Sequence, residues 1–488
     1  MADLQSFTID QFNGGISDLS NRGVKGSFKF GFGLNLRSTS AALTCNQALK
    51  KDSGSTVTDL ILFGVSGSDG NFYGFGDTGK IYKRTSGGTW TLEATDPDGK
   101  VWGATEYEHN NGSGSYVPHM VWATQTKLKK VVLSAGFGSI ATVGTLFKGE
   151  SGQWHTMITA LGVLLYCDSD RLGILDYEAA FNNNALQLPG GIYAKALIDS
   201  ADIVIIGASE KEKQRRGFLF TWDKIQDSWI TKKDIQAQGV NSLNFLESGL
   251  LVQGGQELKY WDTVNLLPLK QVPGGGQSYP GAQSNYNGIA HFGIYGGTKN
   301  GVYGYGRRDK NSPIALNLEY LITPVASKAT LALKEAAIAS GNYEIGMVHN
   351  HQGTLLVSWK DNSGGSPVYG VDIIDTANKA TAVYESLEFD AGSPYADKRF
   401  NPIKIVTKPL PANTSVEVYY RTNNAADWVQ AKTDRKSTSM TGTGKTKEIF
   451  SIGGSGEIYE VKIVLNPSGN TAPEVLAIHN FFSIMGAM

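Results

Sequence analysis

The chain has 488 residues, of which 41% are hydrophobic and only 18% charged, so it has ample material for an apolar core. Its formal net charge of −1 excludes a general electrostatic attraction for phosphate backbones or anionic lipid surfaces. The 59 glycines exceed the common usage of about 7%, which indicates many tight turns.

The first residues, Met1 to Gln5, lack the basic and apolar regions of a signal peptide. No run approaches the roughly 18 apolar residues of a membrane span. Cys45 and Cys167 lie far apart and form no framework of pairs, and the apolar run around Cys167 predicts a buried free thiol. We therefore expect a protein that is made and folded in a cytoplasm, without membrane insertion.

Residues 1–57 are predicted to form an N-terminal arm that contains a closing strand. A turn-rich entry at residues 12–17 precedes a strictly alternating run at residues 28–36, whose aromatic rings share one face. We expect a strand with one buried face there, which either closes the domain that follows or packs against a neighbouring subunit. Gly31 and Gly33 would let another backbone approach closely. The candidate assembly-interface residues are Phe12, Gly14, Gly15, Phe28, Phe30 and Phe32.

The stretch from residue 60 to 93 sets the pattern of the next domain. Four short apolar or alternating runs are joined by turns of Gly, Asp and Ser, which is typical of strands and hairpins rather than helices. A four-stranded meander of roughly 40 residues is one blade of a β-propeller. Similar sets recur, for example at residues 203–230 and 345–374, so we predict an all-β propeller of six or seven blades over residues 58–394.

A single segment, near residues 328–340, has good helical composition. Pro324 precedes it and Gly341 ends it, which is suitable punctuation. We predict a short helical insertion on one rim between the last two blades, where it is a packing element or a gate or contact element. After residue 394 six or so strand-like runs follow within about 95 residues, which predicts a small C-terminal β-sandwich at residues 395–488.

Motifs that suggest chemistry have more probable structural interpretations. Residues 442–446 lack the first glycine of a P-loop and precede a strand-like run, so we predict a hairpin loop. His349 and His351 would project to one face, but zinc needs at least three ligands, so we predict a surface pair at a hairpin.

The dipeptides at residues 222–223 and 261–262 match the Trp-Asp pair of WD40 blades, but no Gly-His partner accompanies them, which favours ordinary strand ends. Acidic residues are numerous, among them Asp168 and Asp372, but no spacing implies a catalytic pair. We predict no catalytic, cofactor-binding or metal site, and hence a protein that is not an enzyme.

The opening of the chain resembles that of bacteriophage tail and virion structural proteins that contain a β-propeller. The resemblance lies in residues 12–17, 28–36 and 43–50, and in a C-terminal segment with a Pro409-Leu410-Pro411 turn and a hairpin containing Trp428. It implies a tail nozzle or tail tubular protein that forms a homo-oligomeric ring, expected to be six-fold, around the genome-ejection channel. The implied partners are other tail or portal-adaptor virion proteins and viral DNA that passes without specific binding. The implied location is the virion tail, after synthesis in the host bacterial cytoplasm.

Two other functions stay open. The first is a receptor- or glycan-binding tail-tip propeller, with or without glycan cleavage, in which Trp90, Tyr107 and Trp229 would stack on sugars. The second is a cellular scaffold of WD40 type. A closed ring would favour the structural function, whereas a monomer retained on a glycan array would favour the first alternative.

Overall fold

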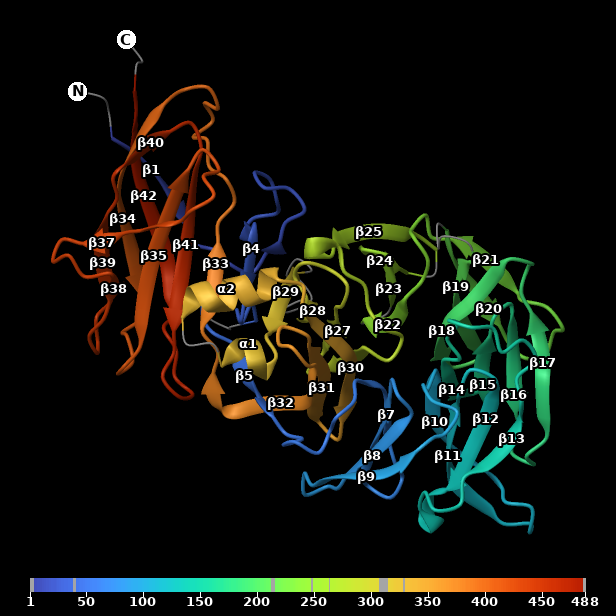
Figure 1. Ribbon diagram of the computed structural model, residues 1–488. Helices are drawn as coiled ribbons and strands as arrows, with labels where there is room; N and C mark the ends of the chain where they lie inside the picture. Colours follow the sequence, from blue (N-terminus) through green and yellow to red (C-terminus); the bar gives the residue numbers. More distant parts are fainter. Residues whose placement is uncertain are drawn as a thin grey trace. The chain divides into compact units, whose positions relative to one another are not determined.

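The computed structural model describes residues 4–37, 41–211, 216–246, 249–262, 264–306, 315–327 and 330–485 (Figure 1). The chain forms two compact units. Unit 1 comprises Met1–Leu49, Tyr303–Leu321 and Ile374–Met488, and unit 2 comprises Lys50–Val302 and Ile322–Ile373.

Unit 2 is a seven-bladed β-propeller, so the fold class predicted from the sequence is confirmed. Blade 1 consists of β6 (Ile61–Ser66), β7 (Phe72–Gly76), β8 (Lys80–Arg84) and β9 (Trp90–Thr95). Blade 2 consists of β10 (Gly103–Asn110), β11 (Tyr116–Ala123), β12 (Lys127–Val132) and β13 (Ala141–Thr145). Blade 3 consists of β14 (Met157–Ala160), β15 (Val163–Asp168), β16 (Arg171–Leu175) and β17 (Phe181–Gln187).

The remaining blades continue the same up-and-down order. Blade 4 consists of β18 (Ile192–Ser200), β19 (Ile203–Glu210), β20 (Gly217–Trp222) and β21 (Thr231–Asp234). Blade 5 consists of β22 (Ser242–Leu246), β23 (Gly249–Gly254), β24 (Glu257–Trp261) and β25 (Leu266–Gln271). Blade 6 contributes the hairpin β26 (Gln283–Tyr286) and β27 (Ile289–Gly293) to unit 2. Blade 7 consists of β30 (Tyr343–His351), β31 (Thr354–Asp361), β32 (Val368–Lys379) and β5 (Gln47–Lys51).

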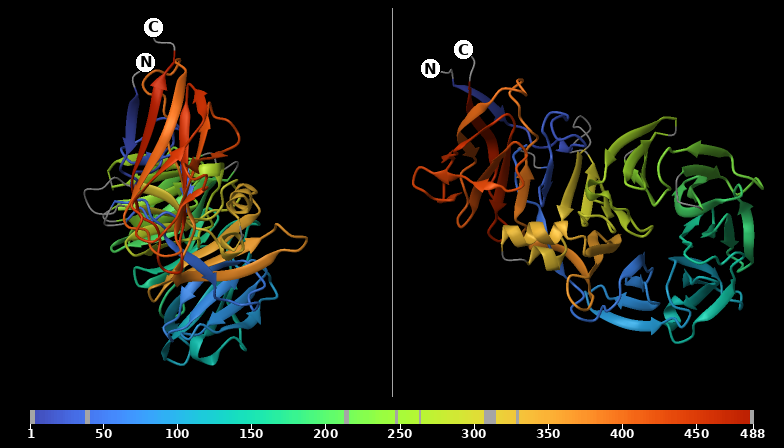
Figure 2. Two further views of the ribbon diagram at one scale, coloured as in Figure 1. Left: turned by 90° about the vertical axis from the view of Figure 1, so that its left-hand side faces the viewer. Right: turned by 45° about the horizontal axis from the view of Figure 1, so that its top comes forward.

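The propeller is a closed ring. The first strands of successive blades, from β6 to β30, contact one another in turn, and β30 contacts β6 (Figure 2). Apolar side chains fill the space between blades; for example, the Trp122 ring of blade 2 lies 6.0 Å from that of Phe75 in blade 1.

The N-terminal segment closes the ring, but through a later strand than expected. The fourth strand of blade 7 is β5, and just after it Asp52 N donates to Val371 O at 2.8 Å. Val371 N in turn donates to Ser53 Oγ at 3.0 Å. The expectation that residues 28–36 close the propeller is wrong, because both edges of the strand they form are already paired within unit 1.

The predicted helical insertion is present between blades 6 and 7. It consists of α1 (Thr323–Ala326), with Pro324 in its first turn, and α2 (Leu331–Ala339). Thr330 caps α2, because its Oγ1 accepts from Leu333 N at 3.3 Å. Residues 328 and 329 of the predicted span lie outside the described residues.

Unit 1 is a β-sandwich. One sheet has the order β1 (Gln5–Ile9), β42 (Val475–Ile484), β34 (Lys398–Thr407), β39 (Lys447–Ser451) and β37 (Lys432–Thr433), with β40 (Gly454–Gly456) also on β34. The other runs β28 (Val302–Gly306), β29 (Ala315–Tyr320), β4 (Phe30–Phe32), β33 (Ala382–Glu385), β41 (Tyr459–Asn466), β35 (Ser415–Thr422) and β36 (Val429–Gln430), with β38 (Ser439–Met440) also on β35. Alternating residues of β34 and β35 are buried, whereas β41 is buried along nearly its whole length.

The N-terminal arm is therefore part of the sandwich. β1 pairs along its length with β42, β4 pairs with β33, and the short β2 (Gly15–Ile16) pairs in parallel with β3 (Ser27–Phe28). The observed unit 1 thus extends beyond the predicted residues 395–488, because strands from both ends of the sequence share its sheets. The predicted loop at residues 442–446 does precede a strand, β39.

Candidate assembly site

The aromatic residues predicted to form an interface lie in the interior of unit 1. Phe12, Phe28 and Phe32 are at most 2% exposed, and Phe30 is 9% exposed. The rings of Phe12 and Phe28 each pack against Tyr384 with centroids 5.5 Å apart. These side chains pack inside unit 1, and their role in assembly stays a prediction.

The glycines of this segment are needed for close packing. Gly15 has φ +75°, and a Cβ there would lie 2.7 Å from Leu316 N. A Cβ at Gly31 would lie 2.3 Å from Val383 O. Another backbone does approach these glycines closely, as the sequence predicted, but it belongs to the same chain.

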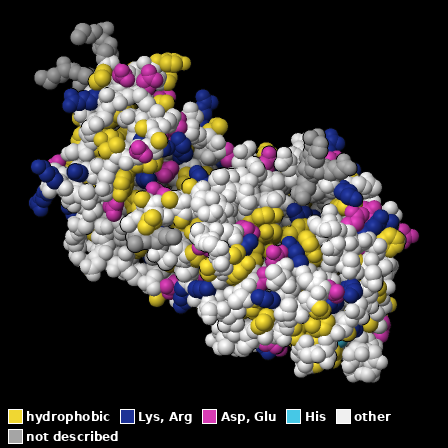
Figure 3. Space-filling view, viewed as in Figure 1, with side chains coloured by type: hydrophobic (Ala, Val, Ile, Leu, Met, Phe, Trp, Pro, Cys, Tyr) yellow, Lys and Arg dark blue, Asp and Glu magenta, His cyan; other side chains and the backbone are white. Residues whose placement is uncertain are grey.

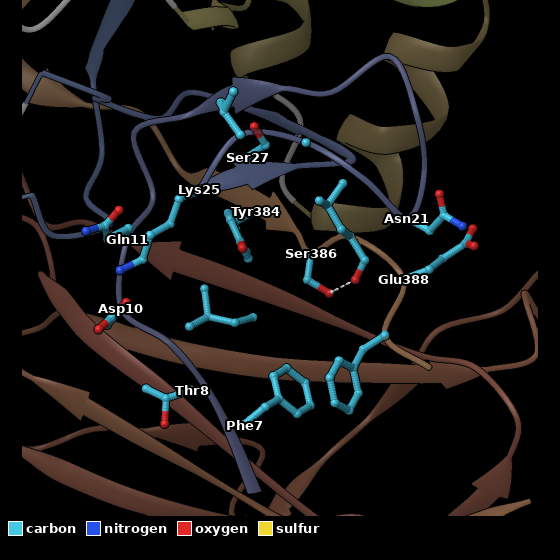
Figure 4. Close-up of a pocket in the computed structure, with 16 residues that line it drawn as sticks. Phe7, Thr8, Asp10, Gln11, Asn21, Lys25, Ser27, Tyr384, Ser386 and Glu388 are labelled. Carbon is cyan, nitrogen blue, oxygen red and sulfur yellow. Dashed lines mark hydrogen bonds between the residues drawn. The ribbon is translucent and has the colours of Figure 1, made fainter. Parts of the chain in front are cut away.

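A groove of about 300 Å³ opens above Tyr384 (Figure 4). The groove is lined by residues 7–11, which belong to β1 and the segment after it, by residues 21 and 23–27, and by residues 384 and 386–389. Asp10, Gln11 and Lys25 lie on one side of the groove, and Asn21 and Glu388 on the other (Figure 4). The groove therefore lies between the N-terminal segment and the loop after β33.

The floor of the groove is apolar and its rim is polar. The rings of Phe7 and Phe389 stack with centroids 3.5 Å apart and an interplanar angle of 22°. Buried Ser386 receives a hydrogen bond from Val461 N at 3.0 Å and donates one to Leu387 O at 2.9 Å. Val24, 53% exposed, adds an apolar side chain to the rim.

A charged network holds this region together. Lys29 Nζ lies 2.9 Å from both Glu388 Oε1 and Glu460 Oε1, and Arg421 Nε lies 2.6 Å from Glu460 Oε2. Burial alone would lower the pKa of Lys29, but the hydrogen bonds to Glu460 and Glu388 outweigh it and raise that pKa. Burial would likewise raise the pKa of Glu460, and hydrogen bonds from Arg421 and Lys29 lower it instead. Glu460 is thus held as the ionised partner of Arg421 and Lys29, which is a packing role within unit 1.

The histidine pair lies at the β30–β31 hairpin, as predicted, but only His349 is partly exposed, so the predicted surface position is wrong for His351. His351 is 2% exposed, and both His349 and His351 pack against the Phe72 ring. Ser66 Oγ lies 3.0 Å from His349 Nε2 and 3.0 Å from His351 Nδ1. Burial, followed by the charge of His351, lowers the pKa of His349 to about 4. Sequence alternation placed the two rings on one face correctly but gave no sign that blade 1 covers that face.

Two of the three aromatics considered for sugar stacking are buried. Trp90 is 6% exposed and its Nε1 donates to Asp52 Oδ2 at 2.7 Å. Tyr107 is 5% exposed and donates to Gly162 O at 3.1 Å. Trp229 packs on Phe220 with ring centroids 5.5 Å apart. These side chains serve the propeller's internal packing.

The remaining motif residues have structural roles as well. Asp223 and Asp262 follow their tryptophans and accept backbone N–H groups in turns, at Ile225 and Val264 respectively. Buried Asp168 accepts from Lys148 N and Gly149 N. Within the described parts of the chain, no three His, Cys, Asp or Glu side chains gather as metal ligands. None of the helices described is long and apolar enough to cross a membrane.

The chain was compared with known proteins. No protein-family model and no curated protein matches it. Among solved structures it is similar to the WD40 β-propeller domain of Doa1, with a TM-score of 0.44, 13% identity and coverage of 67% of this chain and 97% of that chain. It is also similar to the RRP9 WD40 repeats (TM-score 0.42, 12% identity, 67% and 98% coverage) and to U3-55K (TM-score 0.43, 10% identity, 67% and 98% coverage). These similarities extend to the propeller fold alone.

Proposed function

We propose that the chain is a structural virion protein of a bacteriophage tail, a ring-forming nozzle or tubular component around the genome-ejection channel. It assembles into a six-fold homo-oligomeric ring and contacts other tail or portal-adaptor proteins. It is made in the host bacterial cytoplasm and resides in the virion tail. Viral DNA passes through the ring without specific binding.

The observation that supports the proposal is the position of the residues that resemble the phage family. Residues 12–17 contain β2, residues 28–36 contain β4, and residues 43–50 contain most of β5. β4 lies inside a sheet of unit 1, and β5 is the fourth strand of blade 7. The resemblance is therefore concentrated in parts of the chain that hold the architecture together, as a structural function requires.

The ion pairs and hydrogen bonds of two aspartates in the propeller agree with a rigid structural protein. Lys129 Nζ lies 2.5 Å from Asp96 Oδ1, and Trp122 Nε1 donates to Asp96 Oδ2 at 2.7 Å. Asp52 similarly accepts from Arg84 Nε at 2.6 Å. These buried carboxylates each join two or more separate strands or loops, so their charge contributes to fixing the fold.

The oligomeric mass of the purified chain, measured by native mass spectrometry from about 1 to 50 µM, tests the proposal. A single species of six subunits supports it. The same preparation applied to a glycan array separates the main alternative: a monomer that is retained by defined glycans contradicts the structural function and supports a receptor-binding propeller.

A further inference from the structure

A second pocket, of about 450 Å³, lies between blades 4 and 5 of the propeller. Its volume falls within the range of about 300–1,000 Å³ that is usual for ligand sites. Ile205, Leu250 and Trp261 form a buried apolar floor, and Ile230 and Val264 are exposed at the rim, at 41% and 70%. Exposed apolar side chains gathered around an apolar hollow mark an interaction site more often than scattered ones do.

Among the described residues, the lining of this pocket includes Lys232 and Lys233 and no acidic residue. Side chains alternate along β21, so Lys232 and Lys233 point to opposite faces of blade 4. Lys233 Nζ donates to Val264 O in blade 5 at 3.3 Å, whereas Lys232 Nζ lies 4.4 Å from the Phe218 ring centroid. The neighbouring carboxylates face their own turns, because Asp234 accepts from Gln236 N and Asp262 accepts from Val264 N. The pocket is therefore complementary to an anionic, apolar partner.

The outer edge of β21, unpaired among the described strands, indicates that the partner is an extended peptide. This strand ends the order β18-β19-β20-β21, and no described strand pairs with its outer edge. Ile230 and three consecutive residues of β21, Thr231 to Lys233, line the pocket, so the hollow runs alongside that edge. An extended peptide can add to such an edge through main-chain hydrogen bonds and insert alternate side chains into a neighbouring hollow.

We propose that the pocket between blades 4 and 5 binds an extended peptide segment of a partner protein, in which apolar and acidic residues alternate. The peptide pairs with the outer edge of β21. Its apolar side chains enter the pocket over Leu250 and Trp261, and one of its carboxylates lies beside Lys233. This site is separate from the N-terminal groove and independent of the proposed ring.

The probe is a fluorescein-labelled hexapeptide of alternating Leu and Asp, titrated with the full chain by fluorescence anisotropy. We expect saturable binding in the micromolar range that weakens as salt is raised, because the carboxylates contribute. Val264→Asp, which places a like charge at the rim without altering the core, should weaken binding at least tenfold. Lys233→Glu should do the same, whereas Lys232→Glu, on the opposite face of β21, should leave binding unchanged.

Matched controls lie in blade 1. Leu92→Asp changes another exposed apolar residue, 49% exposed, and Lys83→Glu reverses one charge on β8; both should bind the peptide as the native chain does. Equal binding of a Leu-Lys hexapeptide would overturn the proposal, as would Val264→Asp without effect. Saturable binding of octanoate, with no binding of the Leu-Asp peptide, would assign the pocket to small amphipathic acids and also overturn it.

Discussion

At the scale of single residues, Lys398 is the clearest case of a buried charge held by backbone. Its Nζ donates to Ser393 O at 2.7 Å, Ala396 O at 2.7 Å and Glu457 O at 2.8 Å. Lys398→Met would remove a buried donor from three carbonyls, of which Ser393 O still accepts from Ala396 N, so we expect unit 1 to lose roughly 1–3 kcal/mol of unfolding free energy. Hydrogen exchange across residues 393–398 should speed up. Lys404→Met, a partly exposed change on the same strand, is the control and should leave that exchange unchanged.

Asp372 should make stability depend on pH. It is fully buried, its Oδ2 accepts from Thr323 N at 2.7 Å, and burial raises its pKa to about 6. The folded protein therefore holds this proton more tightly than the unfolded chain, whose aspartate has a pKa near 3.9. As pH rises from about 4 to 6, the native chain should lose on the order of 3 kcal/mol of unfolding free energy from this group.

Asp372→Asn removes the titrating group and keeps an acceptor for Thr323 N. The variant should lack the loss between about pH 4 and 6 and should be the more stable protein at pH 7. Urea unfolding at a series of pH values, followed through hydrogen exchange in blade 7, measures the difference. Superimposable pH profiles for the two proteins would show that Asp372 does not titrate in this range.

At the scale of elements, the sequence predicts best what depends on local pattern. The four strands of blade 1 and the helix α2 were predictable, because alternation, turn residues and punctuation all lie within a few neighbours. The pairing of β4 was not, since Val383, which approaches Gly31, is more than 300 residues away in sequence. The closing strand β5 was missed for a similar reason: Gln47 to Lys51 has little alternation, and its pairing with β32 is set by the tertiary fold.

The segment after β5 should act as a latch between blades 7 and 1. Asp52 N donates to Val371 O, while the Asp52 carboxylate accepts from Arg84 Nε at 2.6 Å and Trp90 Nε1 at 2.7 Å. Asp52→Ala leaves the mostly buried Arg84 without its anion, which typically costs about 3–5 kcal/mol. We expect faster hydrogen exchange in both β8 and β32.

The control for the latch is Asp77→Ala. Asp77 also forms an ion pair in blade 1, with Lys100 at 2.7 Å, but its side chain is 42% exposed. An exposed pair contributes at most about 1 kcal/mol. If the two variants loosen β32 equally, or neither does, Asp52 is not the latch.

At the scale of the whole molecule, the surface charge bears on DNA passage. The net charge is −1, and basic and acidic side chains are interspersed over the face that Figure 3 shows. A wall that bound phosphates tightly would retard a passing genome. We expect no measurable binding to a labelled 30-base-pair duplex at roughly 0.15 M salt, measured by fluorescence anisotropy. Submicromolar binding under those conditions would contradict a passive channel.

Electron microscopy of the purified, assembled protein tests the central claim most directly. The account predicts closed rings with six-fold rotational symmetry and a central channel wide enough for duplex DNA, in which every subunit has one seven-bladed propeller and one β-sandwich. Single propellers that stay monomeric at about 50 µM, or open filaments without a channel, would contradict it.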